Sequence, residues 1–280
     1  MRQTTISALQ IEKFKNEMMK NEKAAATIKK YIREVECLKK FLNGRCLTKE
    51  VLLEYRDELM GVHQAQTVNG KLSAVNAFLD FMGLSSFRLK FFRVQRKAFL
   101  DENRELTETE YKRLLMSAKR HGSKRMYYLL MTIAGTGIRI SEVRFITVEA
   151  VKRGKAEVQL KGKTRTILLT KDLRNRLLKY TSECGIRSGC VFRTRSGRPL
   201  DRSNVCHDMK KLCKDAAVDE NKVFPHNLRH LFARVFYAVE KNLAHLADVL
   251  GHSSIETTRI YVAASAVEYE RTLCRMRLIM

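Results

Sequence analysis

A few polar side chains in this 280-residue chain could together act on a phosphodiester. Arg139 follows a Gly-Thr-Gly turn at 135–137, and Arg229 stands on a predicted helix that begins at Pro225. Arginine suits a phosphate because its planar guanidinium donates two parallel hydrogen bonds and keeps its charge at neutral pH. Cleaving a phosphodiester requires the charge that develops on its non-bridging oxygens to be neutralised. The two arginines therefore predict a phosphate-binding site.

Tyr261 is the candidate nucleophile. A free phenol has a pKa of about 10 and attacks poorly at neutral pH unless cations stabilise the phenolate or a base takes the proton. His226 lies three residues before Arg229, on the same helix face, and His252 lies nine residues before the tyrosine. These groups could supply both effects. Ser254 is expected to cap a short helix ending near Tyr261, which would fix its separation from His252.

Each of these residues also has an ordinary structural role open to it. The arginines could be exposed surface residues, His226 a helix-cap partner, and Tyr261, one of nine tyrosines, a core residue. His226 and His230 are four residues apart, as in some zinc sites. However, no H-E-x-x-H carboxylate accompanies them, and Arg229 between them would repel a cation. We therefore expect no metal and no cofactor.

The charge of the chain points to a polyanionic partner. The formal net charge is +24, with +9 in residues 1–100 and +15 in residues 101–280. An excess spread over the whole chain suits a polyanion held from more than one side, and double-stranded DNA is the expected partner. The alternative is a basic protein without a polyanionic partner.

Cysteine usage and hydropathy bound the location. The seven cysteines form no C-x-x-C pair, their number is odd, and no secretory segment opens the chain. We expect reduced thiols in a cytoplasmic protein. No apolar run reaches about 18 residues, so we expect no membrane span.

Apolar periodicity predicts a helical first domain over residues 1–87. Steps of three and four residues mark helices at 24–42, 48–60 and 67–82, with a less periodic one over about 6–20. Residues 88–104 are rich in cations and aromatics without a clear period. We interpret them as a linker, with a strand or a packed turn as the alternative.

Residues 105–280 form the predicted second domain. Thr107 and Glu110 make a capping box, and residues 124–134 form a very apolar helix. Short runs at 156–160 and 164–169, joined by a basic tip, predict a hairpin. The remaining helices are expected at about 171–182, 203–217, 226–239, 242–250, 255–262 and 265–276. The fold class is thus mainly α with one small β-hairpin.

Four motifs together resemble the tyrosine recombinases of the phage integrase family, in their compact two-domain Xer-like form. They are GTGIRISEV, the basic hairpin, PHNLRHLFA and LGHSSIETTRIYV. The resemblance covers the whole chain and implies an N-terminal helical core-binding domain of SAM-like fold. It also implies a C-terminal catalytic domain, the two clamping DNA between them.

The resemblance implies roles for individual residues. Arg139 and Arg229 would grip the phosphate, and Tyr261 would form a 3′-phosphotyrosyl bond. The other implied roles are proton transfer for His226, phosphate contact for His252, acidic support for Glu142 and a structural position for His230.

The hairpin carries the implied general acid. Lys161 matches the lysine that protonates the leaving 5′ oxygen, but the hairpin reads Lys-Gly-Lys-Thr-Arg, one residue shorter than the common form. Lys163 therefore remains a rival for that role. Lys163 and Arg165 are also expected to bind DNA.

The resemblance further implies site-specific recombination without cofactor, by a homotetramer on synapsed DNA. An amphipathic C-terminal helix over 266–280 would pass to a neighbouring protomer, with docking on its own domain as the alternative. The expected setting is prokaryotic and associated with the nucleoid. Two other functions stay open: relaxation of DNA by a type IB topoisomerase mechanism, and a DNA-binding regulator without catalysis. The target DNA sequence and the type of rearrangement do not follow from the sequence.

Overall fold

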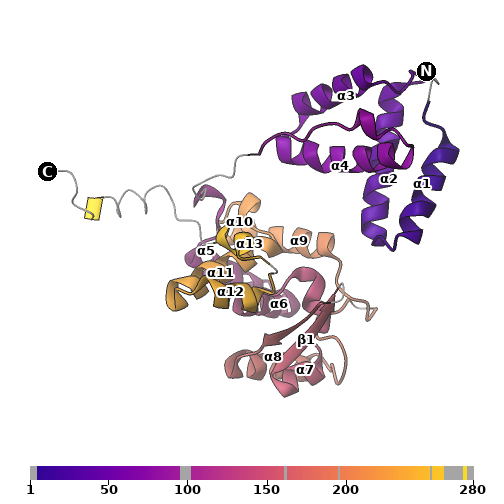
Figure 1. Ribbon diagram of the computed structural model, residues 1–280. Coiled ribbons are helices and arrows are strands. Elements are labelled where there is room, and N and C mark those ends of the chain that lie inside the picture. The colour runs from indigo at the N-terminus through magenta and orange to yellow at the C-terminus, as the bar shows by residue number, and fades with distance from the viewer. Residues whose placement is uncertain are drawn as a thin grey trace. The chain divides into compact units, whose positions relative to one another are not determined.

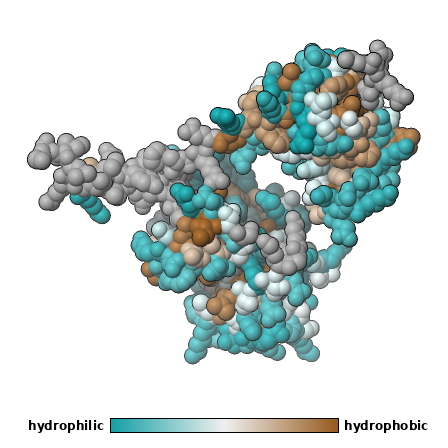
Figure 2. Space-filling view, in the orientation of Figure 1, coloured by the Kyte–Doolittle hydropathy of each residue, from teal (hydrophilic) through white to brown (hydrophobic). Residues whose placement is uncertain are grey.

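The computed structural model divides into two compact units, Met1–Arg96 and Lys97–Met280 (Figure 1). The structure describes residues 5–94, 102–160, 163–194, 196–252, 254–261 and 274–275. Figure 2 shows that hydrophilic side chains cover most of the visible face of both units.

The first unit is a bundle of four helices: α1 (Ala8–Lys20), α2 (Ala25–Leu42), α3 (Lys49–Val62) and α4 (Ala65–Phe81). Ser7 closes a capping box with Gln10 at the start of α1, and the Thr48 side chain caps α3. The helices meet through residues spaced at three and four, which are fully or almost fully buried: Val35, Leu38, Leu52, Val68, Leu72, Val75, Phe78 and Leu79. Burying such side chains contributes about 1.5–3 kcal/mol each, which favours this packing over isolated helices.

The segment Arg88–Val94 packs along α4, so the first part of the expected linker belongs to the first unit. The side-chain amide of Asn76 donates to Leu89 O at 2.9 Å and accepts from Leu89 N at 2.8 Å. Asn69 makes the same pair of bonds with Phe92, both at 2.9 Å. Leu89 is buried in the bundle core. The two asparagines therefore pair with both backbone polar groups of Leu89 and of Phe92, in place of a strand partner.

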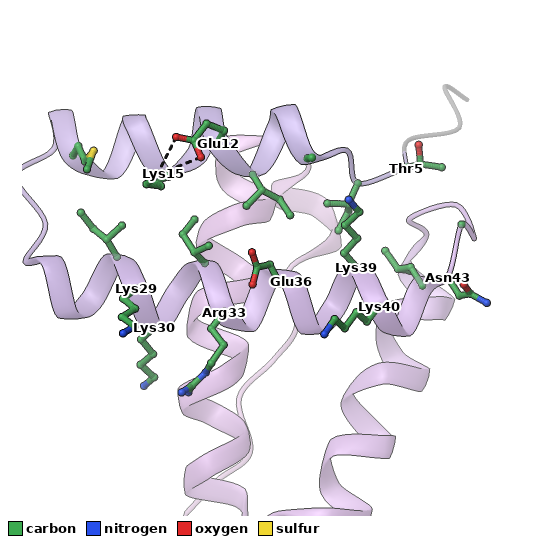
Figure 3. Close-up of a pocket in the computed structure, with 18 of the residues that line it drawn as sticks. Thr5, Glu12, Lys15, Lys29, Lys30, Arg33, Glu36, Lys39, Lys40 and Asn43 are labelled. Atoms are coloured by element: carbon green, nitrogen blue, oxygen red, sulfur yellow. Dashed lines mark hydrogen bonds and ion pairs between the residues drawn. The ribbon is translucent and has the colours of Figure 1, made fainter. Parts of the chain in front are cut away.

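An open groove of about 1730 Å³ lies between α1 and α2, with an apolar floor and a cationic rim. In Figure 3, Lys29, Lys30 and Arg33 point away from α1, whereas Glu36 and Lys39 point toward it. No residue predicted to take part in chemistry lines this groove. It is therefore separate from the candidate site.

The second unit is mainly helical and holds the larger core. Its α-helices are α5 (Glu108–Arg120), α6 (Lys124–Thr136), α7 (Val148–Arg153), α8 (Lys171–Glu183), α9 (Arg202–Lys210), α10 (Cys213–Ala216), α11 (Pro225–Glu240), α12 (Leu243–Leu250) and α13 (Ile255–Arg259). Short 3₁₀ turns are η1 (Ser85–Phe87) in the first unit and η2 (Glu102–Arg104), η3 (Ile140–Phe145) and η4 (Glu220–Lys222) in the second. The apolar helix α6 packs against α5, α8 and α11, and Leu129, Leu130 and Ile133 are fully buried. This position explains why its sequence is so apolar.

One antiparallel hairpin supplies the sheet. Strand β1 (Lys155–Leu160) pairs with β2 (Lys163–Leu168), with Lys155 opposite Leu168 and Leu160 opposite Lys163. The expected fold class, mainly α with one small hairpin, is confirmed. Lys161, at the tip, lies outside the described residues.

Three details of the second unit were predicted wrongly, were not predicted, or lie outside the described residues. The helix expected over 203–217 is broken into α9 and α10, where the buried Ser117 hydroxyl of α5 donates to Leu212 O at 3.2 Å. The short elements η3 and α7 were not anticipated. The helix expected at 265–276 falls almost entirely outside the described residues.

All seven cysteines are free thiols. In the described part of the chain, no helix combines the length and the apolar character needed to cross a bilayer.

Candidate active site

The turn that follows α6 sets the position of Arg139. Gly137 ends the helix with a φ of 62°, a left-handed conformation that favours glycine. A Cβ at this position would lie 2.5 Å from Cδ1 of Phe232 on α11, so only glycine allows the turn and α11 to approach so closely. Arg139 then opens η3 with its side chain 38% exposed.

Glu142 holds Arg139 in place. Its carboxylate accepts from the Arg139 backbone N–H at 3.0 Å and from Arg139 Nη1 at 2.9 Å. Burial alone would raise the pKa of Glu142. The hydrogen bonds from Arg139 and the charges of Arg165 and Arg139 outweigh burial and lower that pKa below its ordinary value. The carboxylate therefore stays ionised and fixes the orientation of the guanidinium.

Arg165, which the sequence predicts to bind DNA, also has partners within the protein. Its side chain is only 12% exposed and is ion-paired with Glu142. Its Nη1 also donates to Val249 O at 3.1 Å, near the end of α12. Gly251 makes room for it, since a Cβ there would lie 2.4 Å from Arg165 Cδ. Arg165 therefore connects the hairpin with η3 and with the end of α12 through contacts of its part-buried side chain.

Arg229 lies beneath the site, with only 1% of its surface exposed. Its Nη1 donates to Gly137 O, and its Nη2 donates to Leu250 O at 2.8 Å and reaches His252 Nε2 at the same distance. Burial and then the charge of Arg139 lower the pKa of Arg229 to about 10, so it remains a cation at neutral pH. It ties three segments together and adds positive charge where water is excluded.

His252 is held as a neutral imidazole of defined tautomer. Because the Arg229 guanidinium can only donate, Nε2 of His252 accepts and Nδ1 carries the proton. Nδ1 then donates to the hydroxyl of Thr258 at 2.8 Å, and Thr258 is fully buried. Burial, followed by the charges of Arg229, Arg139 and Arg165, lowers the pKa of His252 to about 4.

Tyr261 is buried among the histidines. Only 6% of its surface is exposed, and it packs against Ala233, Leu246 and Leu250 of α11 and α12. Its ring stacks on His252 with centroids 5.4 Å apart and an interplanar angle of 21°. The short helix α13 sets this placement, since Tyr261 N donates to Thr258 O at 3.0 Å.

His226 faces the hydroxyl of Tyr261. Its Nε2 lies 3.5 Å from Tyr261 Oη. Removal of water from the ring, followed by electrostatic interaction with His230 and then with Arg229, lowers the pKa of His226 to about 4. The neutral imidazole can therefore accept a proton from the phenol.

His230 stands behind both rings. Its ring centroid is 4.8 Å from that of His226 and 4.5 Å from that of Tyr261, in edge-to-face arrangements. Its Nδ1 is bonded to the buried carboxylate of Glu105 at 3.2 Å. Sequence reasoning missed Glu105 and Thr258: Glu105 is 125 residues away along the chain, whereas Thr258 follows His252 by six residues in the same motif.

Of the two candidate lysines, the structure describes only the backbone of Lys163. Lys161 lies outside the described residues, and Lys163 enters only through its backbone, which pairs with Leu160. Among the described residues, no cluster of His, Cys, Asp or Glu has the geometry to hold a metal ion. The structure thus brings together Arg139, Glu142, Arg165, His226, Arg229, His230, His252 and Tyr261.

Comparison with known sequences identifies the class. The sequence pattern of the phage integrase family matches residues 104–268, more than half of the chain. The protein therefore belongs to this family, the tyrosine recombinases. Relatives along its whole length include tyrosine recombinase XerA of Pyrococcus furiosus, 26% identical over 100% of this chain and 98% of the relative. Another is TnP I resolvase of Bacillus thuringiensis, 25% identical over 94% of this chain and 98% of the relative.

Solved structures share the fold. XerH recombinase bound to its difH substrate superposes with a TM-score of 0.70 at 18% identity, covering 96% of this chain and 84% of that one. A lambda integrase tetramer bound to a Holliday junction gives a TM-score of 0.73 at 14% identity, covering 90% of this chain and 76% of that one. At these identities the likeness establishes the architecture.

Proposed function

We propose that this protein is a site-specific tyrosine recombinase that cleaves and rejoins DNA through a 3′-phosphotyrosyl intermediate. One observation carries the proposal: the Tyr261 hydroxyl lies 3.5 Å from the neutral imidazole of His226, within a cluster that also holds Arg139 and Arg229. A phenol needs a base and nearby positive charge to attack a phosphodiester at neutral pH, and both stand beside it. Family membership supports the same reaction.

Strand cleavage would begin with Tyr261 Oη attacking the phosphorus while its proton passes to His226 Nε2. In the free protein the pKa of His226 is about 4 because of lost hydration and neighbouring cations. A bound phosphodiester brings a negative charge and raises that pKa, which makes His226 a stronger base when substrate is present. Arg139, the more exposed arginine, would hold the non-bridging oxygens, with Arg229 and His252 adding charge and a hydrogen-bonding ring.

The P–O5′ bond breaks as the bond to Tyr261 forms. The departing 5′ oxygen takes a proton from Lys161, for which Lys163 is the rival, and becomes a free hydroxyl. In the rejoining step, the 5′ hydroxyl of another strand attacks the phosphotyrosine and gives its proton to the deprotonated lysine. The P–O bond to Tyr261 breaks, and the phenol oxygen takes back its proton from His226. One phosphoester replaces another at each step, so the cycle needs no nucleotide, metal or cofactor.

The first unit would supply much of the grip on DNA, as a core-binding domain. Cations on α2 and α4 support this role: Glu34, buried between the two helices, is ion-paired with Lys71 at 2.9 Å and with Arg33 at 2.6 Å. The catalytic domain would start near residue 105 and carry Tyr261.

Recombination joins two duplexes, so the proposed working form is a homotetramer on synapsed DNA. The tetramer of lambda integrase on a Holliday junction supports this assembly. The C-terminal segment after Tyr261 would link neighbouring protomers. We place the protein in the prokaryotic cytoplasm, at the nucleoid.

The test is a suicide DNA substrate whose nick releases a short fragment after cleavage, which traps the covalent adduct. Genomic fragments bound by the Tyr261→Phe variant would first be sequenced to obtain the cognate site. Wild type should form an adduct on that site, and Tyr261→Phe should bind the DNA with unchanged affinity but form none. Tyr237→Phe is the matched control, because Tyr237 packs against the same hydrophobic cluster as Tyr261. A normal adduct with Tyr261→Phe would remove that residue from the role.

A strand-exchange assay on two cognate sites then separates recombination from relaxation. Recombinant products support the proposal. Relaxed supercoils without exchange would indicate the topoisomerase alternative, and DNA binding without any adduct in wild type would indicate a regulator.

A further inference from the structure

Helix α11 binds the segment that leads into the second unit through three side chains on one of its faces. Asn227 donates to Arg104 O at 2.9 Å, His230 bonds to Glu105, and Arg234 donates to Leu106 O. Positions 227, 230 and 234 fall at steps of three and four, which place them in one row along the helix. The row lies on the same helix as His226 and Arg229, so the entering segment is attached directly to the candidate site.

Glu105 is an unusual member of this contact. Only 8% of its surface is exposed, yet it is a carboxylate. Its Oε1 faces His230 Nδ1 at 3.2 Å, and its Oε2 lies 3.6 Å from Arg234 Nε, without a hydrogen bond to any described residue. Burying a charge is costly unless it is paired, and an apolar residue would pack here at lower cost. Stability alone therefore does not explain why a carboxylate occupies this position.

The carboxylate fixes the ring of His230. An ionised carboxylate only accepts hydrogen bonds, so Nδ1 of His230 must carry a proton and point toward Glu105. The lowered pKa of Glu105, in which the bond to His230 and the charges of His230 and Arg234 outweigh burial, keeps that acceptor ionised. The His230 ring is thereby held against both Tyr261 and His226, with centroids 4.5 Å and 4.8 Å away.

The contact between the Tyr261 hydroxyl and His226 depends on the position of the His230 ring. Tyr261 Oη and His226 Nε2 are 3.5 Å apart, at the outer limit of a hydrogen bond, so a small rotation of His230 would separate or misalign them. We propose that Glu105 is a positioning residue for strand cleavage, acting through His230 on the pairing of Tyr261 with His226. This inference rests on the recombinase function proposed above.

The experiment compares Glu105→Ala with Glu105→Gln in the full-length protein. Glutamine keeps an oxygen that accepts from His230 Nδ1, whereas alanine removes it. On a suicide substrate in single turnover, Glu105→Ala should cleave roughly 10- to 100-fold more slowly than wild type, the scale expected for slight misplacement of reacting groups. Glu105→Gln should stay within about threefold of wild type, and both should bind DNA with unchanged affinity.

Glu110→Gln is the matched control. Glu110 is also a largely buried carboxylate, ion-paired with Lys222 at 3.1 Å, but it does not touch His230. Its loss should lower the unfolding temperature without slowing cleavage by folded protein. Cleavage at the wild-type rate by folded Glu105→Ala would overturn the inference. So would equal impairment of the Ala and Gln variants in step with their unfolding temperatures.

A spectroscopic measurement keeps the inference testable if Glu105→Ala does not fold. The ¹⁵N shifts of His230 should show a protonated Nδ1 in wild type and in Glu105→Gln. An unprotonated Nδ1 in an active protein would overturn the inference. The absence of any adduct with wild type, by contrast, would count against the recombinase function itself, so the two failures are distinguishable.

Discussion

The hydrogen bond from His252 to Thr258 can be removed without changing side-chain shape. Thr258→Val replaces the hydroxyl by a methyl group at a fully buried position, where His252 Nδ1 donates at 2.8 Å. The variant leaves the Nδ1–H of His252 facing a buried methyl group instead of an acceptor, at a cost of about 1–3 kcal/mol. Moving the proton to Nε2 offers no escape, because it would then face the Arg229 guanidinium, another donor, at 2.8 Å.

The lost hydrogen bond destabilises the position of the His252 ring, which stacks on Tyr261, so the rate of cleavage should fall. At about 1.4 kcal/mol per factor of ten, we expect cleavage to slow roughly 10- to 100-fold. Single-turnover adduct formation measures the rate, DNA affinity is measured in parallel, and Thr258→Ser, which keeps the hydroxyl, is the control. A Thr258→Val protein that is stably folded and cleaves within twofold of wild type would refute the assigned tautomer and its role.

Three further predictions concern stability and binding. Gly251→Ala should destabilise the protein by about 1–3 kcal/mol in urea unfolding, because φ is 64° and the new Cβ would meet Arg165; unchanged stability would contradict the packing described. The unfolded chain protonates its histidines near pH 6.5, whereas His226 and His252 titrate at about 4 in the fold, so stability should be complete above pH 6.5 and fall as pH drops toward 4. Because the pKa of Glu142 is lowered, the stability that its ionised carboxylate contributes is lost only at still lower pH. A urea midpoint that stays constant between pH 7 and 5 would disprove the lowered pKa values of the two histidines. DNA affinity should fall steeply with salt as counterions are released, and a log-affinity plot without slope would argue against phosphate contacts.

Local signals in the sequence predicted most of the fold. The capping box of Thr107 and Glu110 starts α5, Pro225 opens α11, and the apolar stretch 124–134 became the central helix. Such signals act within one turn of chain, so the printed residues suffice to predict them. The break after Lys210 could not be predicted in this way, because it coincides with a contact from α5.

The site was predicted where motifs carry it and missed where distant segments meet. The internal partners of Arg165 were not predicted, because its ion pair with Glu142 and the space left by Gly251 arise only in the folded chain. Glu105 has no motif of its own and gains its place only from the row of side chains on α11. Pairings at such separations depend on tertiary packing, which periodicity does not encode.

The free thiols allow a distance measurement within the protein. Cys37 is exposed on the first unit and Cys184 on the second, whereas burial raises the pKa of Cys213 to about 11 and makes it slow to alkylate. With Cys46, Cys190, Cys206 and Cys274 replaced by serine, donor and acceptor fluorophores attached to Cys37 and Cys184 would make energy transfer report the separation of the units. Single molecules could then be followed as they close on a duplex and release it, with no new cysteine introduced.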